Sequence, residues 1–204
     1  DLATQLSAGA DGPVSYSLVV ANNTATGLTQ GGKVIRYVTE GSKVVGVVDV
    51  DGSGVISAAE QSGNRVFEVS YSSSSGVTFT LLDNVDNGGG DGSSVSLDLA
   101  GIVLATDGDG DAVPLGSGLV VSLNNDVPLA IGAALNRTVY EDALQGGNGG
   151  SGETALTATF GLSDLATQLS AGADGPVSYS LVVANNTATG LTQGGKVIRY
   201  VTEG

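Results

Sequence analysis

The fold is decided by the stretch Arg65-Val-Phe-Glu-Val-Ser-Tyr-Ser72. In an extended chain its even-numbered side chains lie on one side and its odd-numbered side chains on the other, a period of two that is typical of a β-strand. Val, Phe and Tyr favour the same structure. The run Lys43-Val-Val-Gly-Val-Val48 lies upstream and predicts a second strand.

The composition is that of a folded all-β protein. Apolar residues make up 41% of the 204 residues, and Gly occurs 33 times. Disordered chains contain less apolar material, and frequent Val, Ser, Thr and Gly with little Glu or Lys indicates strands joined by Gly and Asp turns. We therefore predict an antiparallel β-sandwich of Ig-like or cadherin-like modules in tandem, with short helical turns.

The same patterns locate the individual elements. We expect short helical turns at 57–62 and at 165–171, the second with a twin at 2–8. Strands are predicted at about 14–21, 33–39, 43–48, 65–72, 77–82, 95–104, 118–123, 156–160 and 177–184.

Charge and missing residue types exclude several functions. The chain has 7 basic and 21 acidic residues, a net charge of −14, and no Cys or His. Nucleic acid and anionic membranes are therefore not expected partners, and no apolar run approaches the roughly 20 residues of a membrane-spanning helix. Thiolate, imidazole and zinc-finger chemistry are absent, and the acidic residues lie in Gly-rich turns without aromatic sugar platforms. We expect no enzyme.

An internal repeat sets the domain organisation. Residues 1–41 recur without a change as residues 164–204. Identity over this length indicates a recent tandem duplication, and a period of 163 residues far exceeds the 20–50 residues of solenoid repeats. The repeating unit is therefore a whole domain, and neighbouring repeats of the same chain are the expected partners.

The boundary between repeats is predicted at Asn124-Asn-Asp-Val-Pro128, because Pro128 cannot continue a strand ladder. Residues 1–126 would then be most of one sandwich repeat without its first strand, and residues 127–204 the N-terminal part of the next. An incomplete sandwich of this kind could exchange a strand with another chain.

The sharpest local motif is the twelve-residue stretch 49–60, which matches an EF-hand calcium loop. Calcium prefers six to eight oxygen ligands, and Gly54 at the sixth position allows the sharp turn between them. A strand rather than a helix precedes the stretch, which favours a lone loop of the dockerin type. The alternative is an ordinary Asp/Gly turn. The predicted ligands are Asp49, Asp51, Ser53, the Val55 carbonyl, Ser57 and Glu60.

A second acidic turn contains Asp107, Asp109 and Asp111. Carboxylates this close repel one another, and a divalent cation would turn repulsion into attraction. The alternative is a solvated Asp-Gly loop.

A third group comprises Asp126 at the repeat boundary together with Glu141 and Asp142. Acidic groups on both sides of a boundary between domains can share a calcium ion and stiffen the joint; the alternative is a polar linker. The stretch 83–91 is either a further site or a flexible hairpin loop.

Several motifs together resemble the extender repeats of repeats-in-toxin (RTX) adhesins, surface proteins that Gram-negative bacteria export by type I secretion. The resemblance covers most of the period. It implies β-sandwich repeats with calcium in loops and between domains, and a location at the bacterial cell surface. The matching stretches begin at Ala8 (AGADGPVSYSL), Val45 (VGVVD), Val66 (VFE), Phe79 (FTLLD), Ala105 (ATDGDGD) and Asn125 (NDVP).

The resemblance implies a calcium-rigidified spacer that projects a distal ligand-binding domain of a large adhesin for attachment and biofilm formation. The alternative function is a module that itself binds a surface glycan or host. The exact duplication favours the spacer, because spacers are multiplied freely whereas a ligand-binding head usually occurs once.

Overall fold

The computed structural model describes residues 12–173 and 175–202. The chain divides into two compact units, residues 1–174 and 175–204, and each is described by itself. All strand pairs in the described residues are antiparallel. The predicted all-β, sandwich-like class is confirmed.

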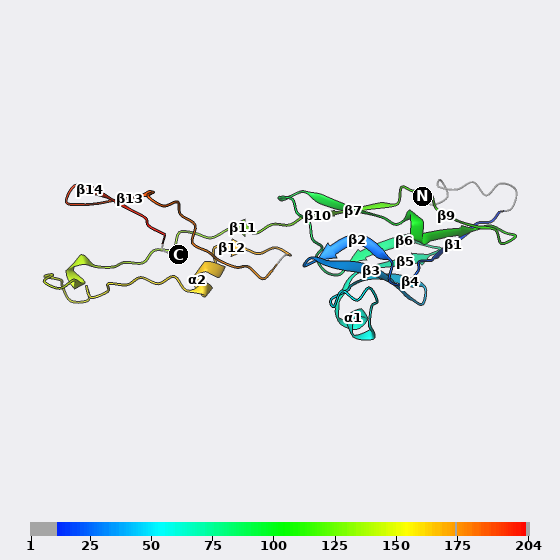
Figure 1. Cartoon of the computed structure of the whole chain (residues 1–204), viewed down its shortest axis with the longest axis horizontal. Coiled ribbons are helices and arrows are strands. Elements are labelled where there is room, and N and C mark those ends of the chain that lie inside the picture. The colour runs from blue at the N-terminus through cyan, green and yellow to red at the C-terminus, as the bar shows by residue number, and fades with distance from the viewer. Residues whose placement is uncertain (1–11, 174, 203–204) are drawn as a thin grey trace. The chain divides into compact units, whose positions relative to one another are not determined.

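The main sheet of the first unit is a five-stranded meander, in which each strand pairs with the next one along the chain (Figure 1). Such hairpin connections need only tight turns. The strands are β2 (Ala25–Gln30), β3 (Lys33–Glu40), β4 (Lys43–Val48), β5 (Arg65–Ser72) and β6 (Gly76–Leu81).

Two smaller sheets complete the sandwich. One pairs β7 (Ser94–Asp98) with β10 (Val120–Asn124), and the other has the order β1 (Ser15–Leu18), β8 (Val103–Thr106) and β9 (Ala112–Pro114). One buried cluster joins side chains of the main sheet, such as Ile35 and Phe67, to Leu97 and Leu123 of the β7–β10 pair. This shared core makes the sheets two layers of one sandwich.

Strand β4 is buried on both faces, which positions the loop that follows it. Val44 and Val48 lie in the shared core, whereas Val45 and Val47 form a separate cluster with Ile56 packed against it. Ile56 belongs to the segment after β4, so this segment covers the outer face of the main sheet. Figure 1 shows the short helix α1 (Ala58–Gly63) on that side and β7 with β10 on the other.

A close contact between β4 and β5 explains a glycine in the middle of β4. Gly46 is paired with Phe67 across the ladder. A Cβ atom at residue 46 would lie 2.2 Å from the Phe67 ring, well inside van der Waals contact. The Phe67 ring therefore occupies the space that a side chain at residue 46 would need.

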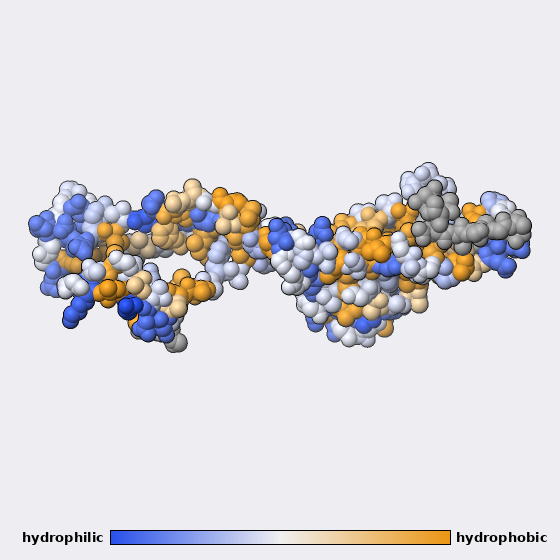
Figure 2. Space-filling view, turned by 90° about the horizontal axis from the view of Figure 1, so that it is seen from above, coloured by the Kyte–Doolittle hydropathy of each residue, from blue (hydrophilic) through white to orange (hydrophobic). Residues whose placement is uncertain are grey.

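The remainder of the first unit carries little regular structure. Helix α2 (Leu162–Ala166) precedes β12 (Leu169–Ser170), which pairs with β11 (Leu129–Ala130), and η3 (Glu141–Ala143) is a single 3-10 turn. The second unit contains one hairpin, β13 (Ala188–Gln193) and β14 (Lys196–Arg199). Figure 2 shows hydrophobic side chains at the surface in several places.

Several predicted elements are confirmed and others are wrong. Strands β4 and β5 have the predicted bounds, and α1 begins one residue after the predicted start. The predicted strand 95–104 is interrupted, because Oδ1 of Asp98 accepts the Ala100 N–H at 2.9 Å and turns the chain into η2 (Ala100–Ile102). Strands β2, β9, β11, β12, β13 and β14 were not predicted.

The predicted strands at 156–160 and 177–184 do not form. Residues 178–181 repeat residues 15–18, which are a strand only because they pair with β8. A strand needs such a partner, and the second unit offers none among its described residues. The predicted helical turn at 165–171 is shifted to α2, and its twin at 2–8 lies outside the described residues.

Candidate metal-binding loop

The candidate site is the loop between β4 and α1, residues 49–60. Asp49 directly follows the last residue of β4, and Ser57 is the N-cap of α1. Gly54 has φ +83°, a left-handed conformation that favours glycine. The loop is thus fixed at both ends by regular structure and turned sharply in its middle, as the sequence predicted.

Three of the six predicted ligands come together in this loop. Carboxylate oxygens of Asp49, Asp51 and Glu60 all lie within 4.8 Å of one another. Asp49 is only 2% exposed and Glu60 only 7% exposed, whereas Asp51 is exposed. Two buried carboxylates beside an exposed third form a group of oxygen ligands with one side open to solvent.

The two oxygens of Asp49 have different environments. Oδ2 accepts hydrogen bonds from Nε of Arg36 at 2.7 Å and from the Gly54 N–H at 2.9 Å. Oδ1 is buried and has no hydrogen-bond partner among the described residues. An unpartnered buried carboxylate oxygen is costly. Because Asp49 also belongs to a three-carboxylate group, this oxygen is a natural ligand for a cation. The Arg36 hydrogen bond is the main reason that the pKa of Asp49 lies below its usual value.

Glu60 is held in place by N–H and O–H donors. Its Oε2 accepts the N–H and the hydroxyl of Ser57, both at 2.8 Å, and its Oε1 accepts the Val50 N–H at 2.9 Å. The hydrogen bonds from Ser57 are the largest cause of the lowered pKa of Glu60, so this carboxyl group is ionised at neutral pH. Oε1 also accepts the Asp51 N–H at 3.4 Å, so each oxygen of Glu60 already accepts two hydrogen bonds, and a metal ion at Glu60 would replace some of these donors.

The remaining predicted ligands make local contacts in this structure. The Ser53 hydroxyl donates to the Val55 carbonyl at 2.9 Å, so these two groups bond to each other. The Ser57 hydroxyl accepts the Glu60 N–H at 3.3 Å, which makes Ser57 one half of a capping box. The residues therefore fit a divalent cation through Asp49, Asp51 and Glu60, all of them oxygen ligands of the kind that calcium prefers.

The second predicted cluster also forms. Carboxylate oxygens of Asp107, Asp109 and Asp111 lie within 4.8 Å of one another, and the last two residues are exposed. Oδ1 of Asp107 accepts the Asp111 N–H at 2.9 Å. A hydrogen bond with the Asp109 side chain is the largest cause of the lowered pKa of Asp107. This cluster has no buried unpartnered oxygen among its described atoms.

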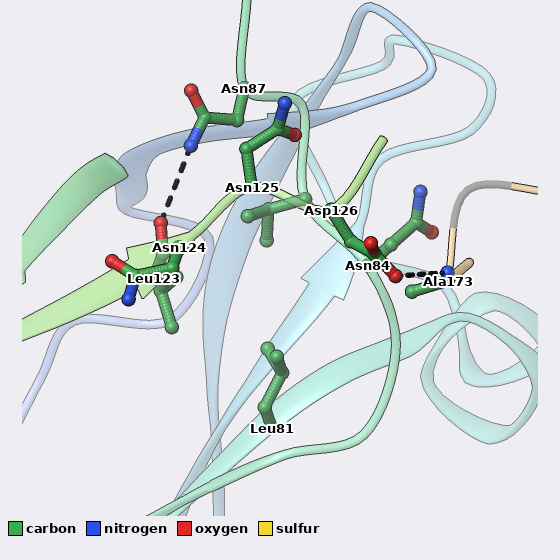
Figure 3. Close-up of a pocket in the computed structure, with 9 residues that line it drawn as sticks. Leu81, Asn84, Asn87, Leu123, Asn124, Asn125, Asp126 and Ala173 are labelled. Carbon is green, nitrogen blue, oxygen red and sulfur yellow. Dashed lines mark hydrogen bonds between the residues drawn. The ribbon is translucent and has the colours of Figure 1, made fainter. Parts of the chain in front are cut away.

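The third predicted group is not brought together. Among the described residues Asp126, Glu141 and Asp142 do not form a three-carboxylate group. Instead, Oδ2 of Asp126 accepts the Ala173 N–H at 3.0 Å at the edge of a small pocket (Figure 3). The Asn125 amide donates to the Gly89 carbonyl at 2.8 Å. The polar residues of the predicted boundary thus fasten neighbouring loops.

Arg36 is a feature of the site that the sequence analysis missed. It lies on β3, opposite Val47 of β4, and its side chain reaches Asp49 across this ladder. A lone Arg in a strand carries no signal for such a contact. Only the β3–β4 register places the guanidinium beside the start of the loop.

The fold and the loop define an all-β sandwich-like domain with two acidic groups able to hold a metal ion. A model of the family DUF5801, described as a domain of unknown function, matches residues 2–114. The chain belongs to this family. No curated protein and no solved structure matches the chain significantly. Within the described residues, no helix has the length and apolar character needed to cross a bilayer.

Proposed function

We propose that this chain is a calcium-rigidified structural spacer from a large bacterial surface adhesin of the repeats-in-toxin type. In this proposal its repeats project a distal ligand-binding domain away from the cell for attachment and biofilm formation. The support is the exact tandem duplication of 41 residues, the sandwich-like fold and the acidic loops.

The observation that carries the calcium part of the proposal is the buried, unpartnered Oδ1 of Asp49. The carboxylate that carries this oxygen belongs to one group with Asp51 and Glu60. Calcium would be held by these carboxylates and would supply the positive charge that their mutual repulsion requires. The loop itself contributes the sharp turn at Gly54, and α1 contributes a fixed position for Glu60.

The physical effect of calcium in this proposal is to order the acidic turns. With a net charge of −14, the ion-free chain repels itself. Binding only to the folded form stabilises it by about 2.7 kcal/mol at a hundredfold excess of ligand over Kd. Extracellular calcium modules bind at about 10⁻⁴–10⁻³ M, so the chain would stay loose at cytosolic calcium levels and stiffen outside the cell.

Calorimetric calcium titration tests the proposal. The parent protein is compared with Asp51→Ala, which removes both the exposed carboxylate and its oxygen ligands from the loop, and with the control Glu68→Ala. Glu68 is a partly exposed acid on β5 that pairs with Lys43, and it belongs to none of the stretches considered as calcium sites. We expect Asp51→Ala to lose one equivalent of bound calcium and Glu68→Ala to keep the parent stoichiometry.

Two outcomes would overturn the calcium site. The first is that the parent protein binds no calcium in the millimolar range. The second is that Asp51→Ala and Glu68→Ala bind calcium with the same stoichiometry. The spacer role is tested separately by the hydrodynamic radius and melting temperature with calcium and with chelator, which must differ if calcium stiffens the chain.

A further inference from the structure

The hairpin of the second unit has the sequence of β2 and β3 but not their burial. Residues 188–199 repeat residues 25–36, and both hairpins have the same register with the same irregularity. The Thr189 hydroxyl donates to the Ile198 carbonyl at 2.9 Å, as the Thr26 hydroxyl donates to the Ile35 carbonyl at 3.0 Å. The hairpin is therefore formed locally and needs no further part of the domain.

Burial of the two copies differs greatly. Leu28 is 5% exposed, but its counterpart Leu191 is 65% exposed. Val38 is 7% exposed, whereas its counterpart Val201 is 72% exposed. Because the sequences are identical, the exposed apolar groups of the second copy belong to a core whose other part is not present around them. We call residues 188–202 the open hairpin.

The first copy identifies what covers these side chains. Along its outer edge β3 pairs with β4, with Val38 opposite Val45. Strand β3 extends over eight residues, because residues 37–40 pair with β4. Strand β14 ends after four residues, where its pairing with β13 ends and no counterpart of β4 lies beside it among the described residues. Apart from Tyr37, the other buried residues of the core that contains Leu28 and Ile35, such as Phe67 and Leu123, also lie between residues 42 and 126.

The contacts of Arg199 are a second, independent indication that the same segment is the partner. Its Nη1 donates to the Asn186 carbonyl at 2.6 Å, as Nη1 of Arg36 donates to the Asn23 carbonyl at 3.0 Å. Arg36 in addition pairs with Asp49, whereas no described carboxylate pairs with Arg199 in the salt bridges of this structure. The guanidinium is thus placed for an acidic residue that directly follows the missing strand.

We propose that the open hairpin is a docking surface for a further copy of residues 42–126, supplied by a neighbouring repeat. This segment supplies the edge strand, the core side chains and the carboxylate for Arg199. It would also bring a second loop equivalent to 49–60. The open hairpin is therefore the junction at which one repeat is completed, and the proposal does not depend on calcium.

Single cysteines test this proposal, because the parent chain has none. They also separate the two copies, whose peptides have identical sequences. Val201→Cys reports on the open hairpin and Val38→Cys is the matched control in the covered copy. In the 204-residue protein we expect rapid thiol labelling of Val201→Cys and slow labelling of Val38→Cys.

The decisive step is to append a copy of residues 42–126 after Gly204. Labelling of Val201→Cys should then slow by about a hundredfold or more, because it would require local opening. The same extension with aspartate at its copies of Val44 and Val69 should leave labelling fast. Fast labelling with the unaltered extension would overturn the proposal. Slow labelling of Val201→Cys in the 204-residue protein would also overturn the proposal. If the protection from labelling increases with protein concentration, the occupant is a second molecule. If the protection is independent of concentration, the hairpin is covered within the chain.

Discussion

Replacing Arg36 by Gln tests whether the guanidinium and a calcium ion compete for the same carboxylate. Asp49 is 2% exposed, and the side chain of Arg36 is 21% exposed. Removing one partner of a buried ion pair costs about 3–5 kcal/mol, and solvent access to Arg36 favours the lower end. We expect Arg36→Gln to lower the free energy of unfolding by about 3 kcal/mol in chelator.

The same substitution should be milder when calcium is bound. The ion then supplies positive charge beside Asp49, and the remaining loss is about 1 kcal/mol, the value of an ordinary hydrogen bond. The difference of about 2 kcal/mol must appear as tighter calcium binding, since the two effects are linked. It corresponds to a Kd about 30-fold lower for Arg36→Gln than for the parent.

Urea unfolding in chelator and in saturating calcium measures both stabilities, and calorimetry measures Kd. Arg199→Gln is the matched control, because Arg199 has the same neighbouring sequence and the same contact to an Asn carbonyl without a carboxylate partner among the described residues. It should change stability by less than about 0.5 kcal/mol. Equal destabilisation of Arg36→Gln in both conditions, with an unchanged Kd, would refute the reasoning.

Two further predictions concern packing and pH. Gly46→Ala should lower the free energy of unfolding by about 1–3 kcal/mol, because the new methyl group clashes with Phe67. The control Gly63→Ala, whose Cβ meets nothing within 4 Å, should leave the free energy of unfolding unchanged in the same denaturation assay. Equal effects of the two substitutions would contradict the close contact between Gly46 and Phe67. The folded-state pKa values of Asp49 and Glu60 are lowered, so their stabilisation is present above the ordinary values of about 4 and is lost as pH falls through the lower folded values. Melting temperatures in chelator should therefore be steady from pH 7 to 5 and fall below pH 4, and a steady value down to pH 3 would contradict this.

The local sequence pattern was sufficient to predict the structure of segments in which the burial of the side chains agrees with that pattern. The strand bounds of β4 and β5 follow from their Val-rich runs, and the helical turn predicted at 57–62 forms as α1, one residue later, with Ser57 as its N-cap. The acidic spacing of the loop likewise placed three carboxylates in one group. In each of these segments the residues that determine the structure are close together in the sequence.

Local pattern failed where the structure depends on a distant partner. Residues 178–181 have the sequence of β1 but form no strand, since β1 exists through its pairing with β8. The Arg36–Asp49 pair arises from the β3–β4 register, and the carboxylates at 126, 141 and 142 do not form one group among the described residues. Such features require the tertiary arrangement.

A crystal structure of the protein grown in millimolar calcium tests the central claim most directly. We predict an ion bonded to Oδ1 of Asp49 at about 2.3–2.6 Å, with Asp51 and Glu60 among its other ligands. Density for water alone beside Asp49, in crystals that contain calcium, would contradict the claim.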